Sequence, residues 1–475
     1  MKILFVYTNI NGFHEDLFSF GLASMVSLSK KYGYECKWIT VNTKQEYQKV
    51  YNELKTYNPR IVAFTSVSSQ FGCVKTLAAG IKEINPHTIT VCGGVHPTIA
   101  PQCVLGTEHL DAVFIGESDF AFIEFLQKVK KNESYKDVHN LAYVEDGKLK
   151  KNSLNPLIPR LDILPFPDRS YDVFTETISK VGFIPFLFSR GCPYACSYCS
   201  NQAIAETYDL NKNNARYRSA ESSICEIEEV IRQYPTSNIF IGDDIFGLDK
   251  RWRYEFCKKY NERIKIKFGC LLRPDLVNEE FMILLKEAGC YRISLGLESG
   301  NEYVRNTIMR RNMSDKTIIK AFDLAHKYGI QTNAINIIGT PGETEEAIWD
   351  TIKLNRRAKP TVTGVNIFYP YEGSVLGDHC FKNNLVDLDL FENFTNERRE
   401  SVLKYPEEYK KKLIYFRENW ETLIYPYNVR KRFGKLVRKT SIWKTLRNVK
   451  NLIKKELLRT KYLKPSRELQ GTSSS

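Results

Sequence analysis

The sequence predicts an α/β protein built from two successive parallel sheets and a helical, basic C-terminal region. Short apolar runs alternate with amphipathic stretches of helical period over residues 1–375, as parallel strands and their covering helices do. A proline-punctuated segment, residues 161–168, interrupts this alternation and divides it into two regions. At 475 residues, the chain is long enough for two or three domains.

The first region, residues 1–135, predicts five β/α units and therefore a flavodoxin-like, doubly wound domain. Its predicted strands are Ile3–Tyr7, Glu35–Val41, Ile61–Thr65, Ile89–Cys92 and Ala112–Ile115. Its clearest predicted helices are Leu17–Lys31 and Cys73–Ile84. A linker over residues 136–182 follows, in which Asp146-Gly147 predicts a hairpin turn.

The second region, residues 183–375, predicts six further β/α units, fewer than the eight of a closed barrel. Its predicted strands are Phe186–Ser189, Asn238–Gly242, Ile264–Phe268, Arg292–Leu295, Thr332–Ile338 and Gly364–Phe368. Its predicted helices are Ala220–Gln233, Trp252–Glu262, Glu279–Glu287, Asp315–Tyr328 and Thr344–Asn355. The last region, residues 376–475, is helical and polar, then basic.

The net charge of +14 is concentrated near the C-terminus, because residues 430–461 hold thirteen Lys and Arg against one acidic residue. An apolar stripe runs through this segment at Ile442, Leu446, Val449, Ile453 and Leu457. Such a helix can lie on an anionic membrane, or it can dock on the protein with its basic face in solvent. Nucleic acid is not an expected partner, because no aromatic residues are interleaved for base stacking.

Three features of the sequence predict the cellular compartment: the absence of a membrane-spanning run, the absence of a secretory signal, and the pattern of its cysteines. No apolar run is long enough to span a bilayer, and the first residues begin a strand where a secretory signal would stand. Twelve scattered cysteines fit reduced thiols better than a disulfide framework. We therefore expect a cytoplasmic protein, with peripheral membrane contact through residues 430–461 as an option.

The strongest chemical signal is a C-x-x-x-C-x-x-C run formed by Cys192, Cys196 and Cys199, in the loop after the apolar strand Pro185–Ser189. Three thiolates this close together can hold three corners of a 4Fe-4S cluster and leave the fourth iron open to a ligand. The alternatives are a zinc site or three unrelated buried cysteines. Zinc would need a fourth ligand at matched spacing, and no second cysteine pair follows.

This spacing, with Tyr198 just before the last cysteine, resembles the radical S-adenosylmethionine (SAM) superfamily. The resemblance implies an open, six-stranded partial TIM barrel. It further implies that SAM chelates the open iron and is cleaved to a 5′-deoxyadenosyl radical, which abstracts hydrogen from the substrate. A reductant such as flavodoxin or ferredoxin would supply the electron. No catalytic residue beyond the cluster is assigned.

The resemblance extends to the turns after four successive strands of the second region, which contact SAM in this superfamily. The matching residues in these turns are Gly242, Asp243, Asp244, Arg273, Glu298, Ser299 and Gly339. Tyr198 of the cysteine loop would stack on the adenine, with packing beside the cluster as the alternative. The aspartates would accept from the SAM amino group, and Arg273 would bind its carboxylate. Glu298 and Ser299 would hold the ribose, while the bare backbone at Gly339 would admit the adenine. The alternatives are an Asp-rich helix cap and a surface ion pair for Arg273.

The first region resembles the cobalamin-binding domain of cobalamin-dependent radical SAM proteins. The residues matched on this basis are Thr65, Ser66, Ser68, Gly93, Gly94, His96, Gly116 and Glu117. Paired glycines after a strand let the backbone approach a bulky ligand. The motif D-x-H-x-x-G, whose histidine ligates cobalt, is absent, and His96 is expected to shape its loop. The sequence therefore does not identify a lower axial ligand of the cobalt. A flavodoxin-like domain that has lost its cofactor is the alternative.

Together the two resemblances imply a cobalamin-dependent radical SAM enzyme, which in its methyltransferase version methylates an unactivated carbon. The expected substrate is a small molecule, or a lipid-like one if the basic segment 430–461 binds a membrane. Cyclisation, oxidation and rearrangement use the same parts and stay open. A methylthiotransferase would need three further cysteines in loops of the first region, where Cys36 and Cys92 fall in strands and Cys73 opens a helix. The intact cysteine run disfavours a non-catalytic cobalamin sensor.

Overall fold

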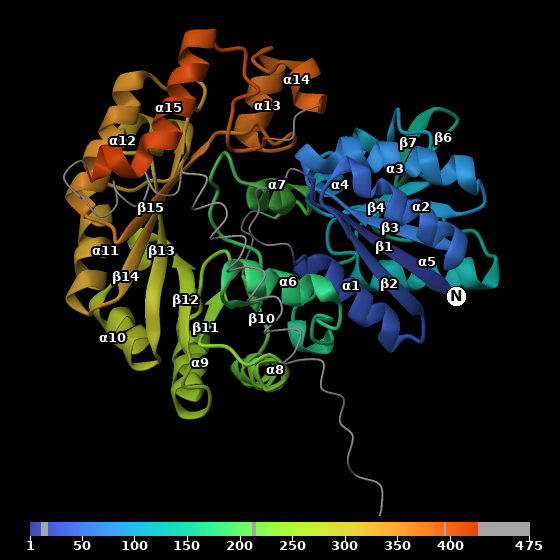
Figure 1. Cartoon of the computed structure of the whole chain (residues 1–475), viewed down its shortest axis with the longest axis horizontal. Helices are drawn as coiled ribbons and strands as arrows, with labels where there is room; N and C mark the ends of the chain where they lie inside the picture. The colour runs from blue at the N-terminus through green and yellow to red at the C-terminus, as the bar shows by residue number, and fades with distance from the viewer. Residues whose placement is uncertain (11–17, 211–214, 394–395, 426–475) are drawn as a thin grey trace, which may run out of the picture.

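The computed structural model describes residues 1–10, 18–210, 215–393 and 396–425. Two sheets lie side by side, each covered by its own helices (Figure 1). The basic segment 430–461, with its predicted apolar stripe, lies outside the described residues. In the part of the chain that the structure describes, no helix is both long and apolar enough to cross a membrane.

The first sheet has seven strands, of which the first five are parallel. They are β1 (Lys2–Thr8), β2 (Glu35–Val41), β3 (Ile61–Thr65), β4 (Ile89–Gly93), β5 (Ala112–Phe114), β6 (Leu141–Glu145) and β7 (Lys148–Lys151). The helices are α1 (Phe20–Lys31), α2 (Tyr47–Thr56), α3 (Phe71–Ile84), α4 (Val95–Ile99) and α5 (Asp119–Lys131). The strand order β2-β1-β3-β4-β5 confirms the predicted flavodoxin-like arrangement.

Alternation of side chains along the strands decides which helices cover each face of this sheet. Ile3 and Phe5 share a hydrophobic cluster with α1 and α5, whereas Leu4 and Val6 share another with α2 and α3. Both faces are therefore buried. The predicted hairpin turn at Asp146 is present, and β6 and β7 extend the first sheet as an antiparallel edge, so residues 141–151 of the predicted linker belong to this sheet.

The second sheet is the predicted open partial barrel of six parallel strands. Its strands are β8 (Ile184–Phe186), β11 (Asn238–Ile241), β12 (Lys267–Leu272), β13 (Cys290–Glu298), β14 (Gln331–Ile338) and β15 (Val362–Ile367). Its helices are α8 (Ala220–Gln233), α9 (Lys250–Arg263), α10 (Glu279–Glu287), α11 (Asp315–Lys327) and α12 (Glu345–Ala358). Each begins after a side-chain cap, in order Ser219, Asp249, Asn278, Ser314 and Thr344.

The third barrel strand does not lie where the sequence predicted it. It was predicted at Ile264–Phe268, whereas β12 covers Lys267–Leu272. The reason is that α9 continues to Arg263, and the chain then turns through a left-handed residue, Lys265, with a φ of 55°. The apolar Ile264 is the C-cap of this helix and is buried in the core without belonging to a strand.

The first barrel strand was predicted as one run, Phe186–Ser189, but the structure divides it. After β8 ends, the N–H groups of Phe188 and Ser189 donate to the Asp243 carboxylate at 2.7 and 3.1 Å, where a strand would pair with its neighbour. The chain then forms a short ribbon with strands β9 (Ser189–Arg190) and β10 (Arg216–Tyr217). The helix α7 (Ser200–Thr207) follows the cysteine loop.

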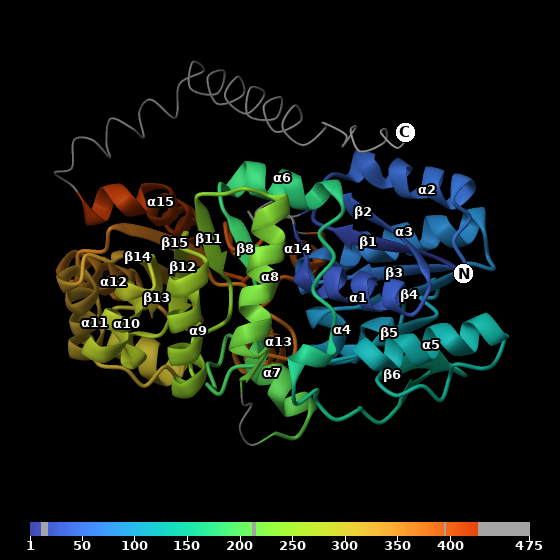
Figure 2. The same ribbon diagram turned by 90° about the horizontal axis from the view of Figure 1, so that it is seen from below.

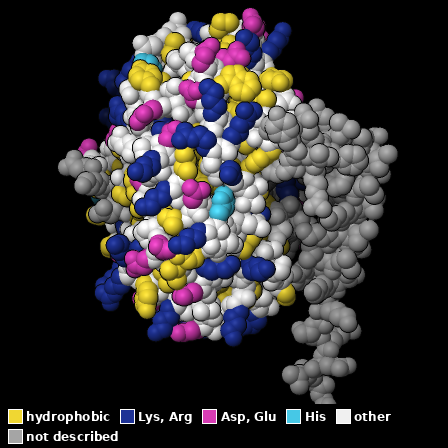
Figure 3. All heavy atoms as spheres, turned by 90° about the vertical axis from the view of Figure 1, so that its left-hand side faces the viewer, with side chains coloured by type: hydrophobic (Ala, Val, Ile, Leu, Met, Phe, Trp, Pro, Cys, Tyr) yellow, Lys and Arg dark blue, Asp and Glu magenta, His cyan; other side chains and the backbone are white. Residues whose placement is uncertain are grey.

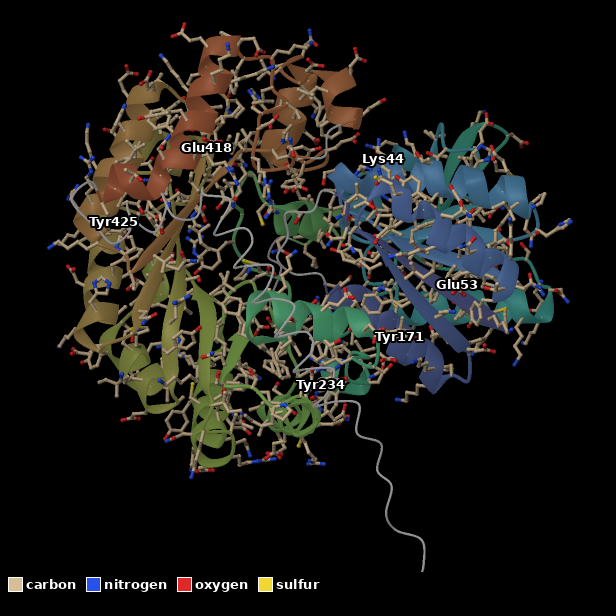
Figure 4. All side chains as sticks on the ribbon, viewed as in Figure 1. Lys44, Glu53, Tyr171, Tyr234, Glu418 and Tyr425 are labelled. Carbon is tan, nitrogen blue, oxygen red and sulfur yellow. The ribbon has the colours of Figure 1, made fainter. Side chains whose placement is uncertain are left out.

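The connecting segment ties the two sheets together through α6 (Asp172–Val181). On one side, Tyr171 donates to the Cys36 carbonyl at 2.8 Å. On the other, Arg169 donates to Glu226 at 2.6 Å, and Tyr234 donates to the Arg169 carbonyl at 3.0 Å. Figure 4 labels Tyr171 and Tyr234 at this junction. A single hydrophobic cluster continues from α1 and α5 through α6 to α8 and α9.

Three helices of the C-terminal region complete the described fold, namely α13 (Val375–Lys382), α14 (Leu388–Asn393) and α15 (Glu407–Ile424). The views in Figures 1 and 2 both place α15 beside β15 and α12. Because β15 is an edge strand, α15 protects it from pairing with another chain. Acidic and basic side chains are interspersed over the outer face of the barrel (Figure 3).

We expect Trp420→Ala to lower the free energy of unfolding by about 3–5 kcal/mol, because removal of a buried indole leaves a cavity. Trp420 is 2% exposed, and its Nε1 donates to Thr363 Oγ1 of β15 at 3.1 Å. Tyr415→Ala, on the same helix and 54% exposed, is the matched control and should cost less than about 1 kcal/mol. Urea unfolding followed by circular dichroism measures both, and equal losses would contradict the role given to α15.

Candidate functional site

The three cysteines of the predicted cluster loop line one cavity of about 140 Å³. Two backbone hydrogen bonds hold the loop from opposite sides. Ser197 N–H donates to the Met309 carbonyl at 3.2 Å, and Leu376 N–H donates to the Ser197 carbonyl at 2.8 Å. Burial raises the pKa of Cys192 to about 11 and that of Cys199 to about 12. Both are therefore thiols until a cation binds.

Two buried arginines approach the middle cysteine. Arg273 Nη1 lies 3.7 Å and Arg311 Nη1 lies 3.8 Å from Cys196 Sγ, so two guanidinium groups face this sulfur. Arg273 also forms a forked ion pair with Asp275, at 3.0 Å for both contacts, and stacks over Tyr194. The predicted alternative of a surface pair is wrong in one respect, because Arg273 is only 4% exposed and lines the cavity.

Arg311 was not predicted as a site residue. It is 6% exposed, donates to the Gly296 carbonyl at 2.6 Å and to Tyr198 OH at 3.3 Å, and lies 3.7 Å from Glu298 Oε1. The sequence signal for it is the pair Arg310-Arg311 after the fourth barrel strand. Left-handed backbone at Arg310 turns the second arginine inward, and the residue types alone do not reveal this.

The two predicted aspartates face different ways. Asp244 is open to the cavity, and burial of its surroundings raises its pKa, partly offset by a hydrogen bond with Asn201. Asp243 points behind the cavity, where it accepts from the backbone between β8 and β9, and burial raises its pKa to about 7. Gly242 N–H donates to the Phe186 carbonyl at 2.7 Å. Of this turn, Asp244 is the side chain available to a ligand.

Of the two residues predicted to bind the ribose, Glu298 and Ser299, only Glu298 lines the cavity. Glu298 lines the cavity, with left-handed backbone at a φ of 64°, and burial raises its pKa against the opposing effect of Arg311. Ser299 is fully buried behind it, where its hydroxyl accepts from Asn301 N–H at 3.2 Å and lies 3.4 Å from the hydroxyl of Thr351 on α12. The structure does not bring Ser299 into the cavity.

Gly339 is likewise not exposed to the cavity. Its left-handed backbone, with a φ of 77°, is covered by Leu413 of α15, and its N–H donates to Glu343 Oε2 at 2.6 Å. Ile335, on the same strand, reaches the cavity instead. The predicted residues that the structure does bring together are Cys192, Cys196, Tyr198, Cys199, Asp244, Arg273 and Glu298.

A second cavity, of about 280 Å³, lies at the carboxyl ends of β3, β4 and β5. Of the predicted cobalamin residues, those that line it are Thr65, Gly93, Gly94, Gly116 and Glu117. Leu187, Ser189 and Arg190 of the barrel line it as well. The cavity is therefore shared by both sheets, at the edge where flavodoxin-like domains bind ligands.

Ser66, Ser68 and His96 do not line this cavity but lie buried close to it. His96 Nδ1 lies 3.1 Å from Ser68 Oγ, and burial lowers the pKa of His96 to about 4, so the ring is neutral near pH 7. His96 N–H donates to the Ser66 carbonyl at 3.1 Å. These contacts give His96 the loop-shaping position that the sequence predicted.

Glu117 was predicted to contact cobalamin, but its carboxylate is bound by an arginine of the barrel. Arg216 of the barrel ribbon binds it through both terminal nitrogens, and Nη1 lies 2.9 Å from Oε2. Beside this pair, Arg190 makes a forked contact with Asp119 at 2.8 and 3.0 Å. Asp119 is 4% exposed and was not predicted as a site residue. The two pairs join the second cavity to the start of the cysteine loop.

Comparison with known proteins identifies the class. The sequence pattern of the radical SAM superfamily matches residues 186–354, and that of the B12 binding domain matches residues 8–126. An uncharacterized methyltransferase of Pyrococcus horikoshii is 30% identical over 338 residues, which cover 70% of this chain and 72% of that protein. The chain belongs to the cobalamin-dependent radical SAM family, whose cofactors are a 4Fe-4S cluster, SAM and cobalamin.

Two further relatives agree in architecture. Cytidylyl-2-hydroxyethylphosphonate methyltransferase of Streptomyces wedmorensis is 23% identical over 450 residues, covering 81% of this chain and 83% of that protein. The radical SAM methyltransferase TsrM from Kitasatospora setae, solved with cobalamin and a 4Fe-4S cluster, superposes with a TM-score of 0.67 at 16% identity. That match covers 81% of this chain and 75% of TsrM, and it shows a common fold.

The residues of both cavities fit these cofactors. In the first, three thiols of one loop face two arginines, and Glu298 Oε2 is buried without a hydrogen-bond partner among the described residues. An ammonium or hydroxyl donor, both of which SAM has, would satisfy such an oxygen. In the second, a Cβ at Gly94 would lie 2.7 Å from the Ser66 carbonyl oxygen, so only glycine lets the end of β4 pack this closely on the loop after β3 beside the cavity.

Glu343, in the turn after β14, predicts a pH dependence of stability. Burial raises its pKa to about 7, although N–H groups of Gly339 and Thr340 partly oppose the shift. Between about pH 4.5 and 7 the folded state therefore holds more protons than the unfolded state, and stability falls as pH rises. The total loss from this group is roughly 3 kcal/mol.

We expect Glu343→Gln to remove this loss. The free energy of unfolding of the variant should therefore rise relative to that of the wild type from pH 5 to pH 8. Glu346→Gln is the control, because hydrogen bonds at the start of α12 lower the pKa of that exposed carboxylate. Urea midpoints measured across this range compare the variants. A difference that does not change with pH would contradict the assignment.

Gly94→Ala should weaken cobalamin binding by about tenfold or more, because left-handed backbone and a contact with β3 both resist a Cβ. The φ of Gly94 is 104°, and an added Cβ would lie 2.8 Å from Thr65 Oγ1. In Gly364→Ala, the control, the Cβ meets no atom within 4 Å. Absorbance titration with hydroxocobalamin measures affinity, and iron content should stay unchanged. Unaltered affinity in Gly94→Ala would argue against this cradle.

Proposed function

We propose that this chain is a cobalamin-dependent radical SAM methyltransferase that methylates an unactivated carbon of a small-molecule or lipid-like substrate. The observation that supports this most is the 30% identical relative described as a methyltransferase, which matches most of both chains. The geometry agrees, because barrel residues line the cavity at the carboxyl ends of β3 and β4. Groups bound in the two cavities would face a common space between the sheets.

When bound, the cluster and SAM supply a hydrogen-abstracting radical, and cobalamin supplies the methyl group. The residues of the chain bind and orient these groups. Cys192, Cys196 and Cys199 would ligate three irons, and the SAM carboxylate would find Arg273 and Arg311 beside Cys196. Asp244 and Glu298 would accept hydrogen bonds from the SAM amino group and ribose. The packed contacts of the cysteine loop keep this arrangement fixed.

Cyclisation is the second candidate. Anaerobic magnesium-protoporphyrin IX monomethyl ester cyclase of Rubrivivax gelatinosus is 26% identical over 339 residues. These residues cover 69% of this chain but 59% of the cyclase. The match to the methyltransferase of Streptomyces wedmorensis is more complete, which favours methyl transfer.

Product analysis tests the proposal. Protein reconstituted anaerobically with iron, sulfide and hydroxocobalamin, then given SAM and a reductant, should form both 5′-deoxyadenosine and S-adenosylhomocysteine. Cys196→Ser should lower 5′-deoxyadenosine on the order of 100-fold or more, because a cluster ligand is lost. Cys225→Ser is the matched control, since Cys225 lies on α8 outside the loop. 5′-Deoxyadenosine without S-adenosylhomocysteine would reject methyl transfer and favour cyclisation or oxidation.

A further inference from the structure

A group of four polar residues connects the C-terminal region to the first sheet. The Glu397 carboxylate, 2% exposed, accepts from the hydroxyls of Ser69 and Tyr371. Arg398 Nε and Nη2 both donate to Tyr371 OH, at 3.0 and 2.9 Å. Arg398 Nε also lies 3.3 Å from Glu397 Oε1. Because Ser69 directly follows Ser68 in the loop after β3, this group is fixed to the domain that binds cobalamin.

The same group lies at the carboxyl end of the barrel. Ile367, the last residue of β15, donates its N–H to the Arg398 carbonyl at 2.9 Å. Chemistry in β/α barrels takes place at this end of the strands.

The backbone and side chain of Arg398 are held in an unusual way. Its φ is 65°, in the left-handed region that residues with a Cβ seldom adopt. Strain of this kind concentrates at binding and catalytic sites. One edge of the guanidinium is committed to Tyr371, yet 42% of the side chain is exposed, and no described residue accepts a hydrogen bond from Nη1. The free edge can bind a planar or tetrahedral oxyanion.

We propose that Arg398 is a substrate-binding residue and that the substrate carries an oxyanion, a carboxylate or a phosphate-type group, which binds the free edge of its guanidinium. This inference rests on the proposed function, because a group transferred between the two cofactor cavities requires the substrate to lie between them. Tyr371 and Glu397 are positioning residues for Arg398. The buried Glu397 holds Tyr371 OH, and that hydroxyl fixes the guanidinium.

The test is protection of Arg398 from phenylglyoxal, an arginine reagent, in the holoenzyme, followed by peptide mass spectrometry. Inorganic phosphate, acetate and neutral acetamide are the probes. A saturating oxyanion should slow labelling of Arg398 about fivefold or more, while acetamide should not. Arg357 serves as an internal control, because it is 59% exposed and pairs with Asp315, the first residue of α11. Its labelling should be the same with every probe.

Tyr371→Phe should lose most of this protection, because Arg398 Nε and Nη2 lose their acceptor. Stronger protection by phosphate than by acetate assigns a phosphate-type substrate, and the reverse order assigns a carboxylate. Equal protection by acetamide, no protection by either anion, or full protection by SAM alone would overturn the proposal. The wild-type labelling decides this even if the variant fails to fold.

The same preparation is assayed for S-adenosylhomocysteine, so that the two proposals are separated. Product formation without protection of Arg398 rejects the oxyanion site alone. Protection without product leaves the oxyanion site in place and counts against methyl transfer.

Discussion

Arg190 and Arg216 leave the short ribbon of the barrel and end on two carboxylates of the first sheet, Asp119 and Glu117. Both pairs are largely buried, and a buried charge that loses its partner costs about 3–5 kcal/mol. Asp119 and Glu117 outweigh the effect of burial and raise the pKa of Arg190. The carboxylates therefore fix the ribbon, and Cys192 stands only two residues beyond Arg190. The position of the cysteine loop relative to the second cavity depends on these contacts.

Because of this constraint, the carboxylate of Glu117 is already bound by groups of the protein. Its oxygens are committed to Arg216, and Ile158 N–H also donates to one of them at 3.3 Å. The cavity consequently presents mostly backbone, glycine and apolar side chains, with Thr65 and Arg190 among its polar groups. Ligand sites of this composition recognise shape more than charge. The ion pairs at this junction fix the barrel ribbon to the first domain, and a ligand in the cavity would contact the surface that lies between them.

Most strands could be predicted because residues buried on both faces form continuous apolar runs, as in β1, β3 and β4. Ile264 shows the limit of that signal, since an apolar residue can be buried by the end of a helix as well as by a sheet. The cysteine loop was recognised because its three ligands lie within eight residues. Arg311 and Asp119 act through partners more than seventy residues away, and their pairing depends on the fold.

A second limit of prediction from sequence concerns adjacent motif residues, of which one lines the cavity and the other is buried away from it. Glu298 and Ser299 are adjacent, yet a φ of 64° at Glu298 directs its side chain into the cavity and leaves Ser299 against α12. Asp243 and Asp244 divide in the same manner. A motif identifies the turn in each case, but the local backbone decides which of the two side chains meets the ligand.

The electrostatics of the first cavity indicate how the cofactors and the protein depend on one another. Burial raises the pKa of Cys192 to about 11 and that of Cys199 to about 12, so both are thiols near pH 7, and it also raises the pKa values of Asp244 and Glu298. Iron is ligated by thiolates, so occupation of the loop requires Cys192 and Cys199 to release their protons. Arg273 and Arg311 already stand beside Cys196, where negative charge then gathers. The thiols of Cys192 and Cys199 therefore take on negative charge only when iron binds them, in a cavity that already holds two guanidinium groups.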